Sequence, residues 1–399
     1  MSEMVPAKRI FIVAGETSGD VLGAGLMAAV KAGIETSVEF VGVGGARMAD
    51  EGLKSLFPIS DIAVMGLGPV LARLPLILRR IRETAEAAIA ARPDAIVLID
   101  SPDFTHRVAA RVRKALPRTP IAIYVSPTVW FWRPKRALKL RRFTDRLLAL
   151  LPFEPQAHAI LGGPPTTYVG HPFILKRDQA RSKTLEGPAP LSEHRVPQVV
   201  VLPGSRRSEI RRQGAIFGAA LGKLRDAIGA FDLTLPVVDH VRAEVERAIA
   251  TWPVQPRLVS GETEKLAAFS RADAALATSG TATLELSLSG VPTVAVYRLD
   301  GIGRLVKRFL KAPRALKPMK LVRSAQLTNV IVGDHALPEF IDDDATPGAL
   351  ARALEQLLGD TPERARQAKA FARLTEIMTP TADFDPNREA AKAVIALLA

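Results

Sequence analysis

Two carboxylates follow the most hydrophobic strand-like segment of the chain, residues 95–99, which reads AIVLI. A carboxylate at the C-terminal end of a parallel strand faces the ligand side of the sheet, where it can act as general base toward a hydroxyl nucleophile. Asp103 stands just before a predicted helix over 105–116, so helix capping explains it. Asp100 lies at the strand edge, where capping does not apply. We expect Asp100 to be the base, with a purely structural role as the alternative.

Two turns combine glycine, hydroxyl and charged residues after buried strands and before helices. In the first, backbone donors and a bidentate guanidinium can close on a diphosphate, and an exposed arginine pair on an ordinary turn is the alternative. In the second, hydroxyls and a glycine surround a helix start that suits a diphosphate, and a glutamate one turn later can accept hydrogen bonds from a ribose diol. A capping box is the alternative for that glutamate. The residues are Gly204, Ser205 and Arg206 in the first turn, and Ser279, Gly280, Thr281 and Glu285 in the second.

The earliest strand-to-helix turn, residues 15–20, is also rich in small polar residues. Such a turn lets backbone N–H groups approach an anionic or sugar ligand, and Glu16, Thr17 and Ser18 are its candidate contacts. The turn is not a GxGxxG fingerprint, so dinucleotide binding has weak support. The alternative is a plain glycine turn capped by Ser18 or Asp20.

Residues 64–82 combine an apolar stripe at helical spacing with several arginines. An amphipathic cationic helix is typical of segments that lie in a membrane interface, where each charge near an anionic leaflet adds about 1 kcal/mol. Pro75 fits only the first turn of such a helix or a kink. An ordinary core-facing helix is the alternative. The stripe comprises Val70, Leu71, Leu74, Ile77, Leu78 and Ile81 with Arg73, Arg79, Arg80 and Arg82 beside it, and basic runs follow at 133–146 and 307–323.

Parallel strands are needed to position these residues, and the sequence predicts them. Apolar runs at 9–14, 38–43, 95–99 and 121–125 alternate with helical stretches, and runs at 198–202, 235–238, 274–277 and 293–296 repeat the pattern. Such alternation predicts sheets covered on both faces. We therefore expect an α/β protein with two Rossmann-like, doubly wound domains whose strand C-termini face a shared cleft. We expect domains at 1–173 and 197–365, a connection at 174–196, and terminal helices at 366–399 that can pack back on the first domain.

The composition agrees with this architecture and excludes several classes of protein. With 399 residues, 48% of them hydrophobic and 24% charged, the chain is long enough for two globular domains. It has no cysteine, no apolar stretch that could span a bilayer and no secretory signal, so we expect a cytoplasmic protein. The net charge of +13 indicates a polyanionic partner, and the 5% aromatic content favours phosphate groups or a membrane over nucleic acid. The histidines are scattered, so we expect no metal and no cofactor.

Several motifs together resemble the lipid-A-disaccharide synthase family in order and spacing, over roughly residues 8–330. The resemblance implies the GT-B glycosyltransferase fold. It also implies condensation of UDP-2,3-diacylglucosamine with 2,3-diacylglucosamine 1-phosphate, which gives a β-1,6-linked disaccharide 1-phosphate and UDP. The motifs are AGETSGD at 14–20, AVMGL at 63–67, IDSPDF at 99–104, YVSPTVWFWR at 124–133, LPFE at 151–154, VGHP at 169–172, LPGSRRSEI at 202–210 and TSGTATLE at 278–285.

The resemblance also assigns roles to residues. Asp100 falls on the catalytic acidic position, Glu16 and Ser18 on the loop that faces the acceptor, and Asn329 near the donor. His171 could touch the acceptor or serve as a structural histidine. Two departures are Thr105, where the family has asparagine, and Leu-Thr-Asn at 327–329, where it has Leu-Pro-Asn. Arg206, Ser279, Gly280, Thr281 and Glu285 fall on the UDP side.

Inversion at the anomeric carbon requires one direct displacement, and therefore one base and no protein nucleophile. We expect this transfer to proceed without a metal. We also expect the protein to bind peripherally to the anionic surface of the inner membrane, and a homodimer is possible. Two other classes remain. One is another GT-B sugar-nucleotide enzyme, such as a UDP-sugar epimerase, and the other is a non-enzymatic basic protein that binds nucleic acid or membranes.

Overall fold

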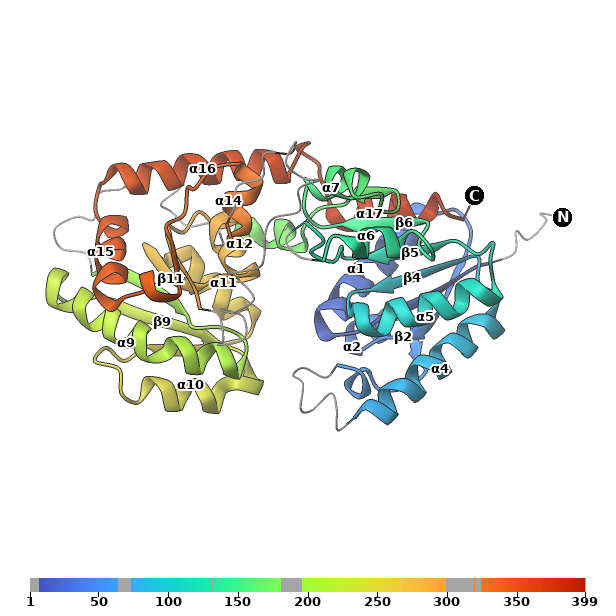
Figure 1. The fold of residues 1–399 in the computed structure, drawn as a ribbon, viewed down its shortest axis with the longest axis horizontal. Helices are drawn as coiled ribbons and strands as arrows, with labels where there is room; N and C mark the ends of the chain where they lie inside the picture. The colour runs from blue at the N-terminus through green and yellow to red at the C-terminus, as the bar shows by residue number, and fades with distance from the viewer. Residues whose placement is uncertain are drawn as a thin grey trace. The chain divides into compact units, whose positions relative to one another are not determined.

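The computed structural model describes residues 7–63, 73–130, 133–180, 196–298, 319 and 324–398. Within these ranges the chain forms two compact units (Figure 1). Of the described residues, those up to 172, residue 319 and residues 381–398 belong to the N-terminal unit, and those within 173–298 and 324–380 belong to the C-terminal unit. Each unit is built on its own parallel sheet.

A seven-stranded parallel sheet forms the centre of the N-terminal unit. Its strands are β1 (Lys8–Ala14), β2 (Val38–Val43), β3 (Lys54–Ser55), β4 (Ala95–Ile99), β5 (Ile121–Tyr124), β6 (Arg146–Ala149) and β7 (Thr166–Tyr168). Their order is β3-β2-β1-β4-β5-β6-β7, so the direction of winding reverses between β1 and β4. Ligands of open α/β sheets bind outside the carboxyl ends of the strands at such a point.

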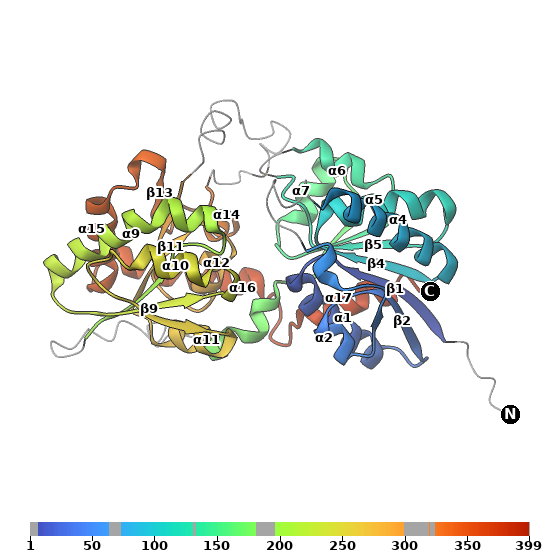
Figure 2. The same ribbon diagram turned by 90° about the horizontal axis from the view of Figure 1, so that it is seen from below.

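Helices cover both faces of this sheet (Figure 2). They are α1 (Thr17–Gly33), α2 (Ala46–Asp50), α4 (Leu74–Ala91), α5 (Pro102–Ala115), α6 (Lys135–Leu140), α7 (Glu154–Ile160) and α17 (Pro386–Ile395). Ile10 and Ile12 of β1 are buried with residues of α1 and α17, whereas Phe11 and Val13 are buried with residues of α4 and α5. Because successive side chains of a strand point to opposite faces, an uninterrupted apolar strand requires helices on both sides.

The C-terminal unit repeats this plan on a six-stranded parallel sheet of order β10-β9-β8-β11-β12-β13. The strands are β8 (Gln198–Leu202), β9 (Asp232–Val237), β10 (Arg257–Ser260), β11 (Ala274–Thr278), β12 (Thr293–Tyr297) and β13 (Glu339–Ile341). The helices are α8 (Arg177–Ala180), α9 (Arg207–Ile228), α10 (Arg242–Ile249), α11 (Glu262–Arg271), α12 (Thr281–Leu288), α14 (Leu327–Val332), α15 (Pro347–Leu358) and α16 (Pro362–Met378). The winding reverses between β8 and β11, so the loops after these two strands open on the same edge.

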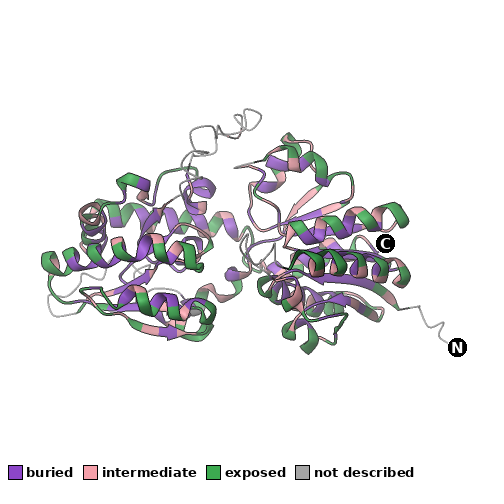
Figure 3. Ribbon diagram, turned by 60° about the horizontal axis from the view of Figure 1, so that its bottom comes forward, coloured by how far each residue is buried: buried purple, intermediate pink, exposed green. Residues whose placement is uncertain are grey.

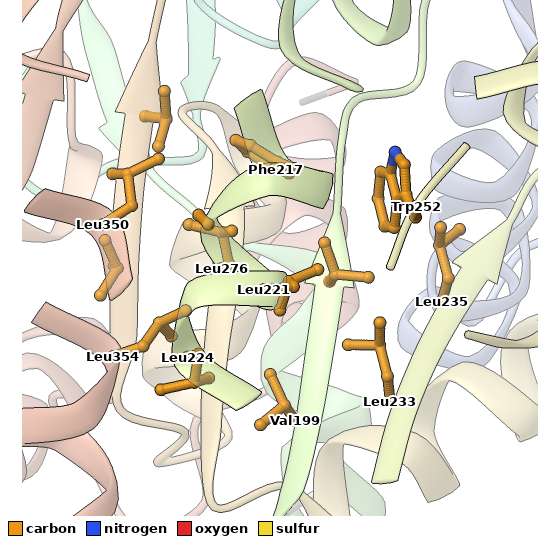
Figure 4. Close-up of a cluster of buried hydrophobic side chains, with 14 of the residues drawn as sticks. Val199, Phe217, Leu221, Leu224, Leu233, Leu235, Trp252, Leu276, Leu350 and Leu354 are labelled. Atoms are coloured by element: carbon orange, nitrogen blue, oxygen red, sulfur yellow. The ribbon is translucent and has the colours of Figure 1, made fainter. Parts of the chain in front are cut away.

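The core of the C-terminal unit lies between its sheet and the helices α9 and α15. Phe217 and Leu221 of α9 pack with Val199 of β8, Leu276 of β11 and Leu350 of α15 (Figure 4). In both units the strands are largely buried and the helices keep an exposed outer face (Figure 3). The predicted pair of doubly wound parallel sheets is therefore confirmed.

Several element boundaries differ from those predicted. The helix expected at 105–116 begins at Pro102, because proline at the first helical position needs no hydrogen-bond acceptor for its nitrogen. Pro75 likewise lies in the first turn of α4. The boundary expected at 365 falls inside α16, which the side chain of Gln367 ties to the backbone of Thr293 within the C-terminal unit. Of the terminal helices, α17 is the one that belongs to the N-terminal unit, where it packs on α1.

Candidate functional site

The loops after β1 and β4 touch each other at the carboxyl edge of the N-terminal sheet. Ala14 and Ile99, the last residues of the two strands, are paired, and the Gly15 N–H donates to the Ile99 carbonyl at 3.2 Å. A Cβ on Gly15 would lie 2.1 Å from the Cβ of Ser101, so only glycine permits this approach. The structure thereby brings the turn at 15–20 beside Asp100.

Asp100 occupies a constrained position in the loop after β4. Asp100 and Ser101 both have positive φ, 55° and 45°, which costs a non-glycine residue free energy and is typical of functional loops. The Asp100 carboxylate accepts a hydrogen bond from the Ser101 N–H at 2.7 Å and is partly exposed. The buried hydroxyl of Thr105 donates to the carbonyl of Asp100 at 2.8 Å. Thr105, the residue that departs from the family pattern, therefore supports the loop that presents Asp100.

The expected capping role of Asp103 is wrong. Because α5 begins at Pro102, Ser101 stands at the N-cap position and Asp103 lies inside the first turn with an exposed side chain. The carboxylate of Asp103 still stabilises the helix through its dipole. Asp100 therefore remains the carboxylate at the strand edge.

The three candidate contacts of the earliest turn lie at the start of α1. Glu16 is at the N-cap position, and Thr17 and Ser18 are the first two helical residues, with exposed side chains. The side chain of the N-cap residue does not cap α1, and among the described residues capping by Ser18 or Asp20 is not observed. The buried carboxylate of Asp20 instead accepts hydrogen bonds from the backbone N–H groups of Gly45, Arg47 and Met48 at the start of α2, at 2.7 to 3.1 Å. Asp20 has a structural role, and Glu16, Thr17 and Ser18 remain candidates.

His171 is not placed beside these loops. It follows β7, the edge strand, which is three strands away from β4 in the sheet, about 14 Å at the usual strand spacing. Its side chain is buried. The preceding residue, Gly170, has a φ of +90° and lies against Phe384, from the segment that leads into α17. These surroundings favour the structural alternative for His171.

A buried polar cluster lies at the carboxyl ends of β5 and β6, and reasoning from the sequence did not find it. Ser126 Oγ and His158 Nε2 are 2.9 Å apart. Glu154 is 3% exposed and accepts a hydrogen bond from the Leu151 N–H at 3.1 Å. Burial raises the pKa of Glu154 to about 8, although hydrogen bonds from Leu151 and Ser126 oppose the shift. Burial also lowers the pKa of His158 to about 4. Both side chains are therefore neutral at neutral pH.

We predict that the folded protein loses stability between pH 6.5 and 8 because of Glu154. The carboxyl is protonated in the folded state up to about pH 8 but ionises near pH 4.5 once unfolded, so rising pH favours the unfolded state. The expected loss from this group is about 1.5–2 kcal/mol across that window. His158 and His106, whose pKa values are both lowered to about 4, take up protons on unfolding mainly near and below their ordinary pKa of 6.5, an effect of opposite sign that the wild type and Glu154→Gln share. Urea unfolding of the wild type and of Glu154→Gln at pH 6.5, 7.25 and 8 measures the effect.

Glu154→Gln keeps the shape and hydrogen-bonding capacity of the protonated acid but cannot ionise. Its free energy of unfolding is therefore expected to fall less over this window than that of the wild type, and the difference between the two slopes belongs to Glu154. Equal slopes would show that Glu154 is ionised in the folded protein at neutral pH.

In the C-terminal unit, the turn after β8 already holds a carboxylate. The N–H groups of Ser205 and Arg206 donate to Glu209 Oε2 at 3.0 and 3.2 Å, and the Arg206 guanidinium donates to Glu209 Oε1 at 2.9 Å. Gly204 has a φ of +126°, and a Cβ there would clash with Glu209. Two backbone donors and a guanidinium thus converge on one anion, which is the chemistry that a diphosphate requires.

The turn after β11 lies on the neighbouring strand and leads into α12. Gly280 is at the N-cap position with a φ of +157°, and no side chain caps the helix. Because glycine has no side chain that could cap the helix, and no other side chain among the described residues does so, the first N–H groups of α12 can take an anion. The capping-box alternative for Glu285 is wrong, because its carboxylate instead pairs with Lys265 of α11 at 3.1 Å.

Lys265 is a second residue that the sequence analysis missed. Its ammonium lies 3.1 Å from Glu285 and 3.2 Å from Glu262. Burial raises the pKa of Glu285, and the positive charge of Lys265 opposes this shift. Lys265 therefore positions the Glu285 carboxylate and favours its charged form, the form that accepts hydrogen bonds from a diol.

Asn329 does not lie open to a ligand. It is fully buried, its amide nitrogen donates to Ser324 Oγ and the Leu337 carbonyl, and its amide oxygen accepts from the Leu337 N–H. The expectation that Asn329 contacts the donor is therefore corrected: Asn329 has a structural role in this loop. The neighbouring Gln326 is also buried and donates to Ser279 Oγ, so the segment around Asn329 supports the turn after β11.

The apolar stripe of α4 divides between surface and core. Leu74 and Leu78 are 39% and 41% exposed, whereas Ile81 is 1% exposed. Ile77 packs on the core cluster that α4 and α5 form with the sheet. Arg79 is exposed. Val70 and Leu71 lie outside the described residues, as does the basic run at 307–323 apart from residue 319. In the described ranges no helix is both long and apolar enough to cross a bilayer.

Arg80 does not belong to a cationic flank of this stripe. Its guanidinium pairs with Asp61 at 2.6 Å and with Glu83 at 2.7 Å, and it stacks over the ring of Phe57 at 4.4 Å. These contacts satisfy its charge inside the N-terminal unit, so the expected membrane role of Arg80 is corrected to a structural one.

Comparison with known proteins agrees with these features. Residues 10–392 match the family described as lipid-A-disaccharide synthetase. The lipid-A-disaccharide synthase of Bradyrhizobium diazoefficiens is 49% identical over 393 residues, which cover 98% of this chain and 97% of that protein. Solved structures with the same fold include a UDP-N-acetylglucosamine 2-epimerase, with a TM-score of 0.58, 12% identity and coverage of 98% and 95% of the two chains. Another is the calicheamicin glycosyltransferase CalG4, with a TM-score of 0.54, 14% identity and coverage of 99% of each chain.

The two kinds of likeness carry different weight. At 12–14% identity the solved structures show the fold alone, which is the GT-B fold of two parallel-sheet α/β units. The family match covers nearly the whole chain and includes every motif quoted from the sequence. The chain therefore belongs to the lipid-A-disaccharide synthase family.

Proposed function

We propose that this protein joins UDP-2,3-diacylglucosamine to 2,3-diacylglucosamine 1-phosphate, and so makes the disaccharide of lipid A. The observation that carries the proposal is the family match over residues 10–392, with 49% identity to a curated lipid-A-disaccharide synthase. The loops described above supply a base in the N-terminal unit and anion-binding groups in the C-terminal unit, as such a transfer needs.

In the proposed mechanism, Asp100 acts on the acceptor. The oxygen of the acceptor 6-hydroxyl attacks the anomeric carbon of the donor, and the bond from that carbon to the β-phosphate oxygen breaks. The hydroxyl proton passes to the Asp100 carboxylate, and UDP leaves with the bonding electrons. The Ser101 N–H and Thr105 hold the loop of this base in place, so the carboxylate needs little rearrangement during the step.

The C-terminal unit stabilises the leaving group in this proposal. Negative charge grows on the β-phosphate as UDP departs, and Arg206 and the start of α12 offer fixed positive groups to it. Gly280 and Thr281 present backbone N–H groups at that helix start, and Ser279 and Thr281 present hydroxyls, whereas the Ser279 N–H donates to the Val296 carbonyl. Glu285, held by Lys265, accepts hydrogen bonds from the ribose hydroxyls.

The direct test is to incubate the protein with both lipid substrates and to identify the product by mass spectrometry. A tetraacyl disaccharide 1-phosphate, with UDP released only when the acceptor is present, is the expected result. Release of UDP from the donor alone would instead identify a hydrolysing enzyme of the epimerase type. No turnover with either substrate, together with steeply salt-dependent binding to DNA, would identify a basic binding protein.

Because both substrates carry acyl chains, we also propose that the protein acts at the inner surface of the bacterial inner membrane. Leu74 and Leu78 are adjacent on one face of α4 and half-exposed, and Arg79, the residue after Leu78, is exposed as well. Apolar side chains beside an exposed cation suit the interface of an anionic bilayer.

The double variant Leu74→Ser/Leu78→Ser is predicted to fold as the wild type does but to bind membranes less. Both leucines already contact solvent, so their loss costs little packing, whereas insertion into the acyl region depends on them. Pelleting with vesicles that contain anionic phospholipid should decrease, and the apparent KM for the lipid acceptor should rise.

Ile81→Ser is the matched control, because it makes the same change in chemistry at a buried position of the same helix. It should lower the unfolding temperature, since it places a hydroxyl and a cavity in the core. If the double variant unfolds at a similarly reduced temperature while its vesicle binding stays normal, the leucines belong to the core.

A further inference from the structure

A pocket of about 650 Å³ lies between α5 and α6 in the N-terminal unit. Its volume is in the range of small-molecule sites. Leu140 and Phe143 form apolar walls, and the remaining lining is dominated by positive charge. Five cationic side chains line the pocket against one carboxylate, that of Asp103: Arg107, Arg133, Lys135, Arg136 and Lys139.

Helix geometry explains why these charges converge. Asp103, His106 and Arg107 are three and four residues apart, so they share one face of α5. Lys135 and Lys139 are four residues apart on α6 and share a face in the same way. Ala137 and Leu140 are buried and fix α6 against the unit, so the lysines and α5 residues line one space.

Four of these five cations have no carboxylate partner in the part of the chain that the structure describes. The side chains of Arg107, Lys135, Arg136 and Lys139 form no ion pair within the described parts of the chain, unlike Arg80, which pairs with two carboxylates. Like charges gathered around one cavity repel each other, and a bound anion relieves that repulsion. His106 responds to the same field: burial, and then the positive charge of Arg136, lower its pKa to about 4.

The position of the pocket relates it to the proposed base. Pro102 and Asp103, which line the pocket, follow Asp100 by two and three residues, and Pro102 is the first residue of α5. The positive end of the α5 dipole therefore adds to the charge of the side chains. A ligand whose hydroxyl meets Asp100 can extend its other end toward these cations.

We propose that this pocket binds the phosphate monoester at the anomeric carbon of the acceptor sugar, so that the phosphate orients the 6-hydroxyl, which is carried on the carbon at the other side of the ring oxygen, toward Asp100. The inference rests on the proposed function, since it assigns a subsite to the acceptor of that reaction. Guanidinium and ammonium groups are the usual partners of phosphate esters, and several of them together favour a dianion over a neutral sugar.

Arg136→Gln/Lys139→Gln is the test, measured in neutral detergent micelles with the acceptor and with the same acceptor lacking its phosphate. The variant should raise the KM for the phosphorylated acceptor by at least about tenfold. It should leave the KM for the dephosphorylated acceptor and for the UDP-sugar unchanged. Arg107→Gln, from the other helix, should act in the same direction, which keeps the test valid if the double variant fails to fold.

Arg141→Gln/Arg142→Gln is the matched control, because it removes the same charge from exposed positions that follow α6 and do not line the pocket. An equal rise in KM for control and test variants would show general electrostatic attraction and overturn the proposal. Suppose instead that the test variant has the same ratio of KM values for the two acceptors as the wild type and loses only its binding to anionic vesicles. That result would overturn the proposal in favour of a membrane headgroup.

A calorimetric titration tests the pocket even if the wild type makes no disaccharide. It measures the binding of glucosamine 1-phosphate to the wild type and to the test variant. Binding that the test variant has lost supports the pocket, and binding that is equal or undetectable in both overturns it.

Discussion

Asp100→Asn is expected to lower the rate of disaccharide formation by about 10²- to 10⁴-fold, the usual cost of losing a general base. The variant keeps the size of the side chain and a carbonyl oxygen that can accept the Ser101 N–H, so the loop after β4 should keep its shape. What it loses is the ability to take a proton from the acceptor hydroxyl. Steady-state kinetics with both lipid substrates measure the loss, which should lie in kcat.

Two controls separate chemistry from folding and binding. The affinity of Asp100→Asn for UDP should equal that of the wild type, because the UDP contacts are assigned to the C-terminal unit. Asp94→Asn makes the same substitution at the other end of β4, where the carboxylate accepts the Arg9 N–H at the exposed surface, and its turnover should be near that of the wild type. A folded Asp100→Asn protein with normal kcat would remove Asp100 from the mechanism.

The position of Asp100 could be predicted because it depends on local sequence. An uninterrupted apolar run predicts a buried parallel strand, and the first polar residue after such a strand lies at the ligand edge. The same logic located the turns at 204–206 and 279–281, each of which follows a strand and precedes a helix in the structure. Where a strand ends, a short window of sequence is enough to place a residue.

Pairings between distant segments could not be predicted in this way. Ser126 and His158 are 32 residues apart, and Lys265 and Glu285 are 20 residues apart, so only the packing of separate elements brings each pair together. Asp20 looked like a cap for its own turn and instead caps α2, because helix α2 starts beside it in space. The sequence around a carboxylate shows which N–H groups are near it in the chain. It does not show which helix start lies next to it in the folded protein.

The arginines of α4 show the same limit on the surface. Periodicity placed Arg80 among the membrane-facing cations, but Asp61 and Phe57, which approach from an earlier segment, enclose its guanidinium. Ile81 follows the stripe in sequence yet turns into the core, since a helix that lies on a sheet must bury one side. Amphipathic spacing predicts that a helix has two faces but not what each face contacts.

Arg206→Ala is expected to weaken the binding of UDP by about 1.5–3 kcal/mol, the range for a hydrogen bond to a charged group. Arg206 is the arginine directly after the Gly-Ser turn, and its guanidinium and the N–H groups of Ser205 and Arg206 already converge on one carboxylate, that of Glu209. A diphosphate offers the same donors more negative charge and more acceptor oxygens than a carboxylate does. Calorimetric titration with UDP at low ionic strength measures the change, and the disaccharide rate should fall with it.

Arg207→Ala is the matched control, since it removes the same charge from the next residue, which is exposed at the start of α9. The side chain of Arg206 is 62% exposed, so salt screens its attraction for the diphosphate, and the difference between the two variants should shrink as ionic strength rises. If Arg206 serves only to neutralise Glu209, then Arg206→Ala will bind UDP as tightly as the wild type. In that case the two backbone N–H groups and the start of α12 would have to carry the diphosphate without a guanidinium.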